Sequence, residues 1–219
     1  MPAGRPRKLT RVQVTWLRRV SRKHERYIAG YEFPSYFWER VRKRLPDLSP
    51  RAMELIELGL RDWFICCAWR WGTVVGMPSR AVDEAWHEFI LDTREYAGFC
   101  TAAFGEYLHH TPDEAMSTPM GDALGETVRA WDRSEAGREE ESVLWDLDRR
   151  LGIPEPLGID GAALEAARAR SPYPAATGLA GAGYAAGACA AGGGDFGGGG
   201  DGGGGGGGCG GGGCGGGGS

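Results

Sequence analysis

The chain has 219 residues, a formal net charge of −4 and 39 glycines, of which 22 lie among the last 28 residues. About 170 residues remain for folding, which is enough for one domain with its own core. No apolar run reaches the roughly 18 residues of a membrane span, and none follows the N-terminus as in a secretory signal. The adjacent cysteines Cys66 and Cys67 suit buried thiols better than a disulfide framework. We therefore expect a cytoplasmic protein with reduced thiols and no membrane span.

Charge is divided unevenly along the chain. Residues 1–44 hold 13 lysines and arginines against three acidic residues, a net of +10, so the remainder carries −14. Residues 1–9 form a basic arm, and the first helix has a basic face made of Arg18, Arg19, Arg22 and Lys23. This face could lie on the phosphates of nucleic acid, or it could be the solvated outer surface of a helix. The second interpretation is favoured, because no helix-turn-helix spacing accompanies the basic face.

Helix start and stop signals divide the first 170 residues into helical stretches. Thr10 is a cap for the first stretch, and Ser49-Pro50 combines a cap with a proline at the first helical position. The stretch after Pro50 is apolar on most of its faces, so we expect it to be the central helix. The stretches are Thr10–Ala29, Ser35–Arg44, Pro50–Trp71, Ser79–Leu91, Thr93–Leu108, Gly121–Glu135, Arg138–Leu151 and a weak last one at Asp160–Arg170.

Strand signals are nearly absent, since no alternating run of β-branched residues occurs. We therefore predict an all-α fold, with a single irregular domain of six or seven helices over residues 10–170. An Ala/Gly/Pro linker at 171–191 and a disordered Gly/Cys tail at 192–219 are expected to follow. The reason is that these segments hold too few large side chains for burial to offset the entropy of ordering.

One constellation has the composition of a chemical site. Asp83 and His87 are four residues apart, so both point from one face of the predicted helix Ser79–Leu91. If the chain turns at Asp92-Thr93, Cys100 on the next helix comes to the level of His87, with both roughly 8–10 Å from the turn. Asp83, His87 and Cys100 are therefore the expected core trio of this site.

A fourth group comes from one of two adjacent histidines. His109 and His110 lie about 13–15 Å further along the helix if it stays straight. His110, or else His109, joins the trio only if that helix ends early and the chain folds back. Such a set could hold zinc or iron, or it could form a thiol site. The alternative is a core histidine beside Trp86 and a small buried cysteine, because no standard zinc spacing such as CxxC is present.

The same stretch carries a resemblance to a known family. The core pattern of the glycine-rich domain-containing protein-like family is similar to Val82-Asp83, Trp86-His87, Tyr96, Cys100 and His110 in this chain, which resembles a short member of bacterial type. The match covers roughly residues 35–115, and the glycine tail agrees with it in character. Members are known mostly from plants and fungi, where they are linked to development and stress responses without an assigned reaction. The resemblance implies that the patterned Asp, His, Tyr and Cys residues are the ones to test, and it implies no enzyme.

Two isolated cysteines, Cys209 and Cys214, lie within the glycine tail, and Cys189 precedes it. Glycine leaves a thiol exposed and the backbone free. Three interpretations remain open. The tail is a plain flexible segment, a substrate for post-translational modification of its cysteines, or a tether whose thiols pair or bind a soft metal.

The sequence supports three hypotheses on function, and it identifies no specific reaction. The leading hypothesis is a non-enzymatic interaction or scaffold protein with a flexible Gly/Cys tail and an unidentified protein partner. The first alternative is a metal-dependent or thiol enzyme that uses Asp83, His87 and Cys100. A further alternative is nucleic-acid binding through the basic first helix.

Overall fold

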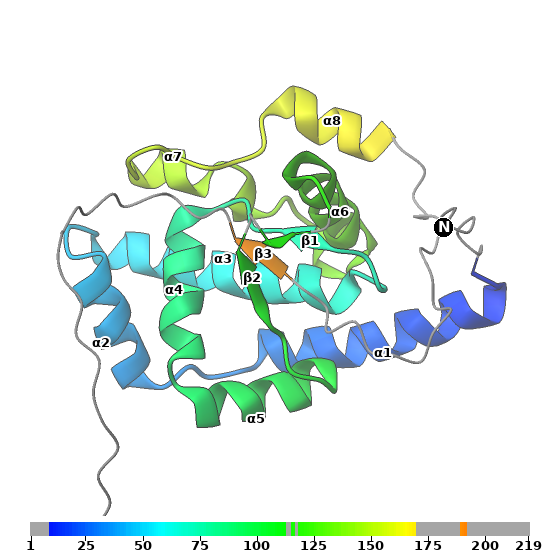
Figure 1. Cartoon of the computed structure of the whole chain (residues 1–219), viewed down its shortest axis with the longest axis horizontal. Helices are drawn as coiled ribbons and strands as arrows, with labels where there is room; N and C mark the ends of the chain where they lie inside the picture. Colours follow the sequence, from blue (N-terminus) through cyan, green and yellow to red (C-terminus); the bar gives the residue numbers. More distant parts are fainter. Residues whose placement is uncertain (1–8, 113–114, 117, 170–188, 192–219) are drawn as a thin grey trace, which may run out of the picture.

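The computed structural model describes residues 9–112, 115–116, 118–169 and 189–191, and this part of the chain confirms the predicted all-α class (Figure 1). It holds eight α-helices: α1 (Arg11–Ala29), α2 (Ser35–Arg44), α3 (Pro50–Trp69), α4 (Arg80–Ile90), α5 (Thr93–Phe104), α6 (Met120–Arg133), α7 (Leu147–Leu151) and α8 (Gly161–Ala169). Two 3₁₀ turns and three short strands complete it: η2 (Ala136–Arg138), η3 (Val143–Trp145), β1 (Val75–Gly76), β2 (His110–Pro112) and β3 (Cys189–Ala191).

Helix α3 is the central helix, as the sequence predicted, and α1, α4 and α6 all pack against it (Figure 1). Its start follows the predicted signals, because the Ser49 hydroxyl accepts a hydrogen bond from the Ala52 amide and Pro50 takes the first helical position. Cys66 and Cys67 are buried as thiols in the apolar core, which confirms the sequence interpretation of this pair.

The N-terminus of α4 is held in place by a residue from the far end of the fold. Ser79 caps the helix through its hydroxyl, and the completely buried carboxylate of Asp148 on α7 accepts hydrogen bonds from the Ser79 hydroxyl and the Arg80 amide, each over 2.7 Å. The same carboxylate accepts from the Ala81 and Leu157 amides. Asp148 therefore fixes the helix that carries the candidate site.

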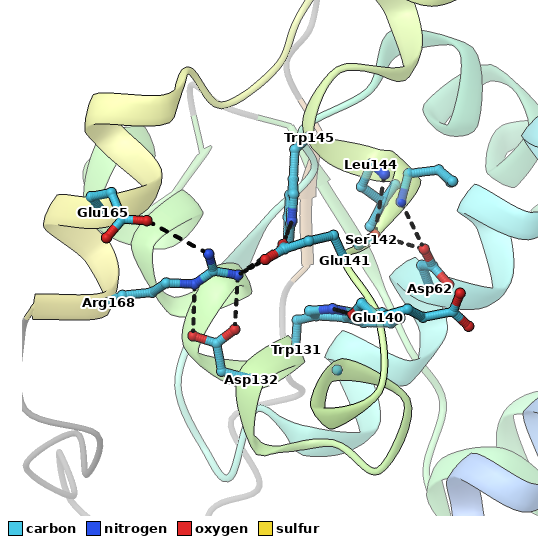
Figure 2. A network of polar contacts seen from close by, with 12 residues as sticks. Asp62, Trp131, Asp132, Glu140, Glu141, Ser142, Leu144, Trp145, Glu165 and Arg168 are labelled. Atoms are coloured by element: carbon cyan, nitrogen blue, oxygen red, sulfur yellow. Dashed lines mark hydrogen bonds and ion pairs between the residues drawn. The ribbon is translucent and has the colours of Figure 1, made fainter.

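The predicted helix Arg138–Leu151 is wrong, because the chain there forms η3 and the five-residue helix α7 instead. The buried carboxylate of Asp62 on α3 accepts hydrogen bonds from the Ser142 hydroxyl over 2.6 Å and from the Val143 amide over 3.2 Å. Figure 2 shows this contact beside a second one, in which Arg168 of α8 donates to Glu141 of this segment over 2.8 Å and also reaches Asp132 of α6. Long-range polar contacts thus draw the segment across α3 and α6, and a continuous helix does not form.

The three strands form a parallel sheet in the order β1–β3–β2, which the sequence did not predict. Strand β3 is the central one, and it comes from the end of the segment predicted as a linker. In register, Cys189 pairs with Val75 on one side and with His110 on the other. A sheet this small has no alternating apolar pattern to reveal it, because its two- and three-residue strands are too short for one.

Several sequence predictions fall on other parts of the chain. Residues 1–8 of the basic arm and the tail with Cys209 and Cys214 lie outside the described residues, so the predicted disorder and thiol chemistry of the tail stay predictions. Among the described residues, no helix combines the length and the apolar character that crossing a membrane requires.

Candidate metal centre

Helix α4 and strand β2 bring together Asp83, His87 and His110. One potential ligand atom from each of these residues lies within 4.8 Å of the others. Asp83 is in the first turn of α4 and His87 follows one turn later, so the helix itself places these two on one face. His110 is the first residue of β2 and reaches the group from outside the helix.

The Asp83 carboxylate approaches both imidazole rings, one with each oxygen. Its Oδ2 is 3.4 Å from His87 Nδ1, and its Oδ1 is 3.4 Å from His110 Nε2. The two ring centroids are 4.3 Å apart. One carboxylate and two imidazoles therefore converge on a single small volume. A simple ion pair with Asp83 would need only one imidazole.

The proton on His87 is placed by its backbone contact. His87 Nδ1 is 2.8 Å from the carbonyl oxygen of Asp83, and a carbonyl only accepts. We therefore assign the proton of the neutral ring to Nδ1, which leaves the lone pair on Nε2 for a ligand. A hydrogen bond of this kind from the second ring nitrogen is the usual support of a metal-binding histidine.

The three side chains differ in their access to solvent. The exposed fraction is 8% for the Asp83 side chain, 18% for His110 and 46% for His87. The carboxylate is thus the most buried of the three groups, and His87 is the one most open to solvent. An ion can reach such a site from the surface without any opening of the core.

His110 reaches this site because α5 is shorter than predicted. The helix ends at Phe104 instead of continuing to Leu108, since Gly105 adopts a left-handed backbone conformation with φ 75° and turns the chain. The Tyr96 hydroxyl then donates to the Leu108 carbonyl over 2.6 Å and accepts from Trp86 Nε1 over 3.0 Å. This buried contact holds the returning chain two residues before His110.

Cys100 is not part of the group, which corrects the predicted trio of Asp83, His87 and Cys100 to Asp83, His87 and His110. The buried positions of α5 are Tyr96, Phe99, Cys100 and Ala103, a single helical stripe that faces the core. The Cys100 thiol is completely buried in that core. The predicted trio depends on the position of Cys100 along the helix axis. The direction in which its side chain leaves that axis decides which groups it meets.

The neighbouring histidine, His109, does not replace His110. Its side chain is exposed, and its ring packs against Tyr107 with the centroids 4.8 Å apart. Successive residues of an extended chain point to opposite sides, so only one of the two histidines can face Asp83. The sequence does not predict the contacts that Trp86 and Leu108 make with Tyr96. Trp86 is expected there only as a core neighbour, and Leu108 takes part through its backbone carbonyl, which no residue type signals.

The basic face of α1 is partly used inside the fold. Arg22 forms an ion pair with Glu135, with Nε 3.0 Å from Oε1 and both side chains about half exposed. The other three cations of the predicted nucleic-acid face are Arg18, Arg19 and Lys23. The nucleic-acid hypothesis stays a prediction, and one of its four cations already has a partner within the chain.

A family model described as UCP032817-like matches residues 23–155, which is more than half of the chain and includes all three residues of the centre. No curated protein and no solved structure matches the chain. The resemblance to glycine-rich domain-containing proteins stays a prediction.

Proposed function

We propose that this chain, which belongs to the UCP032817-like family, binds one divalent transition-metal ion through Asp83, His87 and His110. The observation that carries the proposal is the convergence of two imidazoles and one carboxylate within 4.8 Å. Two imidazole nitrogens and a carboxylate oxygen form a donor set used for zinc and for iron(II), and it differs from the all-oxygen sets of magnesium and calcium. Zinc and iron(II) are therefore the ions to test.

The geometry of the ligands supports this proposal. His110 Nε2 and Asp83 Oδ1 are 3.4 Å apart, which is about the separation of two ligands on one tetrahedral ion with bonds near 2.1 Å. The Asp83 carbonyl fixes the His87 ring, so this ligand is oriented before any ion binds. Three protein ligands leave at least one position on the ion for water or for another ligand.

The test is the metal content and metal affinity of the full chain. We expect one equivalent of zinc or iron(II) after reconstitution under reducing, oxygen-free conditions, and its loss in Asp83→Asn, His87→Ala and His110→Ala. His109→Ala is the matched control, because His109 is the exposed neighbour outside the group. Circular dichroism shows whether each variant is folded. Equal metal binding by His110→Ala and the wild-type chain would overturn the proposal, as would a folded wild-type chain that binds neither ion.

We propose a second function, that of an interaction protein, from an exposed apolar pair on α1. Val12 is 78% exposed and Trp16 is 62% exposed, and they lie one turn apart on the same side of the helix. The buried residues of α1 are all in its second half. A solvent-exposed tryptophan at the start of a helix is costly to leave in water, and tryptophan is among the side chains most enriched in interfaces.

The partner that the charges favour is a second copy of this chain. The first 44 residues carry +10 and the remainder carries −14, so the basic helix of one copy is complementary to the acidic part of another. We expect sedimentation velocity to show concentration-dependent association that weakens with salt and is lost in Trp16→Ser. Tyr36→Ser is the control for an exposed aromatic residue elsewhere. A chain that stays monomeric over the whole concentration range rejects self-association.

A further inference from the structure

A cavity of about 240 Å³ lies between α6 and α8. Its lining comes from both helices and from the residues just before α8, and it includes Leu124, Gly125, Val128, Ile159, Ala163 and Ala167. Val128 and Ile159 belong to the buried core, whereas Ala163 is exposed. The cavity, called the α6–α8 cavity below, therefore extends from the core to the surface.

The two helices that form the cavity are fixed to each other beside it. Arg129 of α6 donates from Nη1 to the Ala167 carbonyl over 3.1 Å, and Figure 2 shows the contact of Arg168 with Asp132, over 3.3 Å. At Gly125 a Cβ atom would lie 3.9 Å from Ala167 Cβ, so α8 lies close to α6 at this point. The α6–α8 cavity is thus part of the packing of the folded chain.

The α6–α8 cavity has the size and the chemistry to hold one large aromatic side chain. Apart from Asp160, every lining residue is a glycine or has an apolar side chain. A dry apolar cavity of roughly 150 Å³ holds benzene, so a cavity of about 240 Å³ has room for the larger bicyclic ring of tryptophan. Burying such a ring removes roughly 150–250 Å² from water, which favours association.

Helix α1 presents a tryptophan of this kind on its surface. Four exposed residues recur every three or four positions and so share one side of α1: Val12, Trp16, Arg19 and Lys23. Helix α1 packs against α3 and α5, whereas α8 packs against α6 on the other side of α3 (Figure 1). Trp16 is 62% exposed, so the cavity of its own chain does not hold it.

The charges around Trp16 and around the cavity are complementary. Helix α1 carries six basic residues and one acidic residue, a net of +5, whereas residues 120–169 carry 12 acidic and six basic residues, a net of −6. Asp160 is an exposed part of the cavity lining, and the exposed Asp122 follows the lining residue Gly121 in the first turn of α6. The surface that surrounds the cavity therefore favours a basic helix.

We propose that Trp16 of one copy of this chain inserts into the α6–α8 cavity of a second copy. Arg19 and Lys23 follow Trp16 along the helix, so they bring positive charge to the acidic surface around the cavity. The inference rests on the proposed self-association and names the surface that receives Trp16. Since the inserted side chain and the cavity belong to different surfaces, the contact is heterologous, and each copy carries one of each.

One variant removes the inserted side chain and another fills the cavity. Ala163 is an exposed lining residue, so Ala163→Phe occupies the cavity with its own ring and leaves the core unchanged. We expect both Trp16→Ser and Ala163→Phe to raise the dissociation constant of self-association at least about tenfold in sedimentation velocity, as for a hot-spot tryptophan. Ala162→Phe is the matched control, because Ala162 is exposed on α8 but outside the lining, and it should associate like the wild-type chain.

Mixing the two variants tests whether the two surfaces meet. Trp16→Ser still has an open cavity, and Ala163→Phe still has an exposed tryptophan. A mixture should therefore form a 1:1 complex, although neither variant associates alone at the same concentration. A contact between two Trp16 surfaces would not be restored in this way. Circular dichroism shows that each variant is folded, and Ala166→Phe, also at an exposed lining residue, replaces Ala163→Phe if that variant does not fold.

The outcomes separate this inference from the proposed self-association. If Trp16→Ser loses association but the cavity variant associates like the wild-type chain, self-association stands and the cavity is not its receptor. If both variants lose association and their mixture does not restore it, Trp16 and the cavity do not contact each other and the inference is overturned. If the wild-type chain stays monomeric, self-association fails and the inference fails with it.

Discussion

The Tyr96 hydroxyl donates to the carbonyl of Leu108 over 2.6 Å, and this contact determines where His110 lies. Tyr96 is on α5 and Leu108 is on the segment that returns from it, so the hydrogen bond closes the turn at Gly105. Trp86 of α4 donates to the same hydroxyl, which connects the helix that carries Asp83 and His87 to the strand that carries His110. Tyr96 and Trp86 are therefore positioning residues for the proposed metal centre.

Replacing this hydroxyl should weaken the metal site without removing a ligand. Tyr96→Phe keeps the ring but leaves the Leu108 carbonyl and Trp86 Nε1 without this partner. We expect a loss of about 1–3 kcal/mol in the free energy of unfolding and a fall of about 10–100-fold in metal affinity. Urea unfolding and metal titration measure the two effects. Tyr107→Phe is the control, and an unchanged metal affinity in Tyr96→Phe would contradict the positioning role.

The buried carboxyl of Asp62 should make stability depend on pH. Burial raises its pKa to about 7, although the hydrogen bonds from Ser142 and Val143 act in the opposite direction. In the unfolded chain an aspartate titrates near 3.9, so between about pH 4 and pH 7 the folded state holds a proton that the unfolded state has released. The free energy of unfolding should therefore fall as the pH rises through this interval.

Asp62→Asn tests this dependence, because the amide oxygen can still accept from Ser142 and Val143 and carries no charge. We expect the variant to lose that slope between about pH 4 and pH 7 and to be more stable than the wild-type chain at pH 8. The difference should be on the order of a few kcal/mol, measured by urea unfolding at a series of pH values. The exposed Asp47→Asn should leave the slope unchanged. The same slope in Asp62→Asn and wild type would assign it to other groups.

The Asp148 carboxylate should be sensitive even to the isosteric amide. Its Oδ1 accepts from the Ser79 hydroxyl and the Ala81 amide, and its Oδ2 accepts from the Arg80 and Leu157 amides. In Asp148→Asn one of these oxygens becomes an NH₂ group, which faces donors and cannot accept from them. We expect a loss of about 2–4 kcal/mol in the free energy of unfolding, measured with denaturant. A loss below the experimental error would show that α4 has another anchor.

Two glycines on helices should respond to alanine in opposite directions. At Gly59 a Cβ atom would lie 2.8 Å from Val82 Cγ2 and 3.0 Å from Leu147 Cδ2, so Gly59→Ala forces α3 away from α4 and α7 and should cost about 1–3 kcal/mol. At Gly98 no atom lies within 4 Å of such a Cβ, so Gly98→Ala should stabilise α5 by up to about 1 kcal/mol. Thermal unfolding compares the pair, and a stabilised Gly59→Ala would show that this helix contact is not tight.

Local signals in the sequence determined most of the helices and two of the three residues of the candidate site. The caps at Thr10 and Ser49 are formed as predicted, because a cap depends on residues within one helical turn. The spacing of Asp83 and His87 placed both on one face of α4 for the same reason. The all-α class followed from the apolar periodicity of these stretches.

Only the tertiary structure decided which other residues meet Asp83 and His87. His110 reaches them through the turn at Gly105 and the Tyr96–Leu108 contact, whereas Cys100 faces the core. The pairing of Cys189 with His110 joins residues 79 positions apart, and no local pattern encodes such a contact. The sequence determined what each helix presents locally, and the packing of α4, α5 and the sheet determined which of those groups lie together.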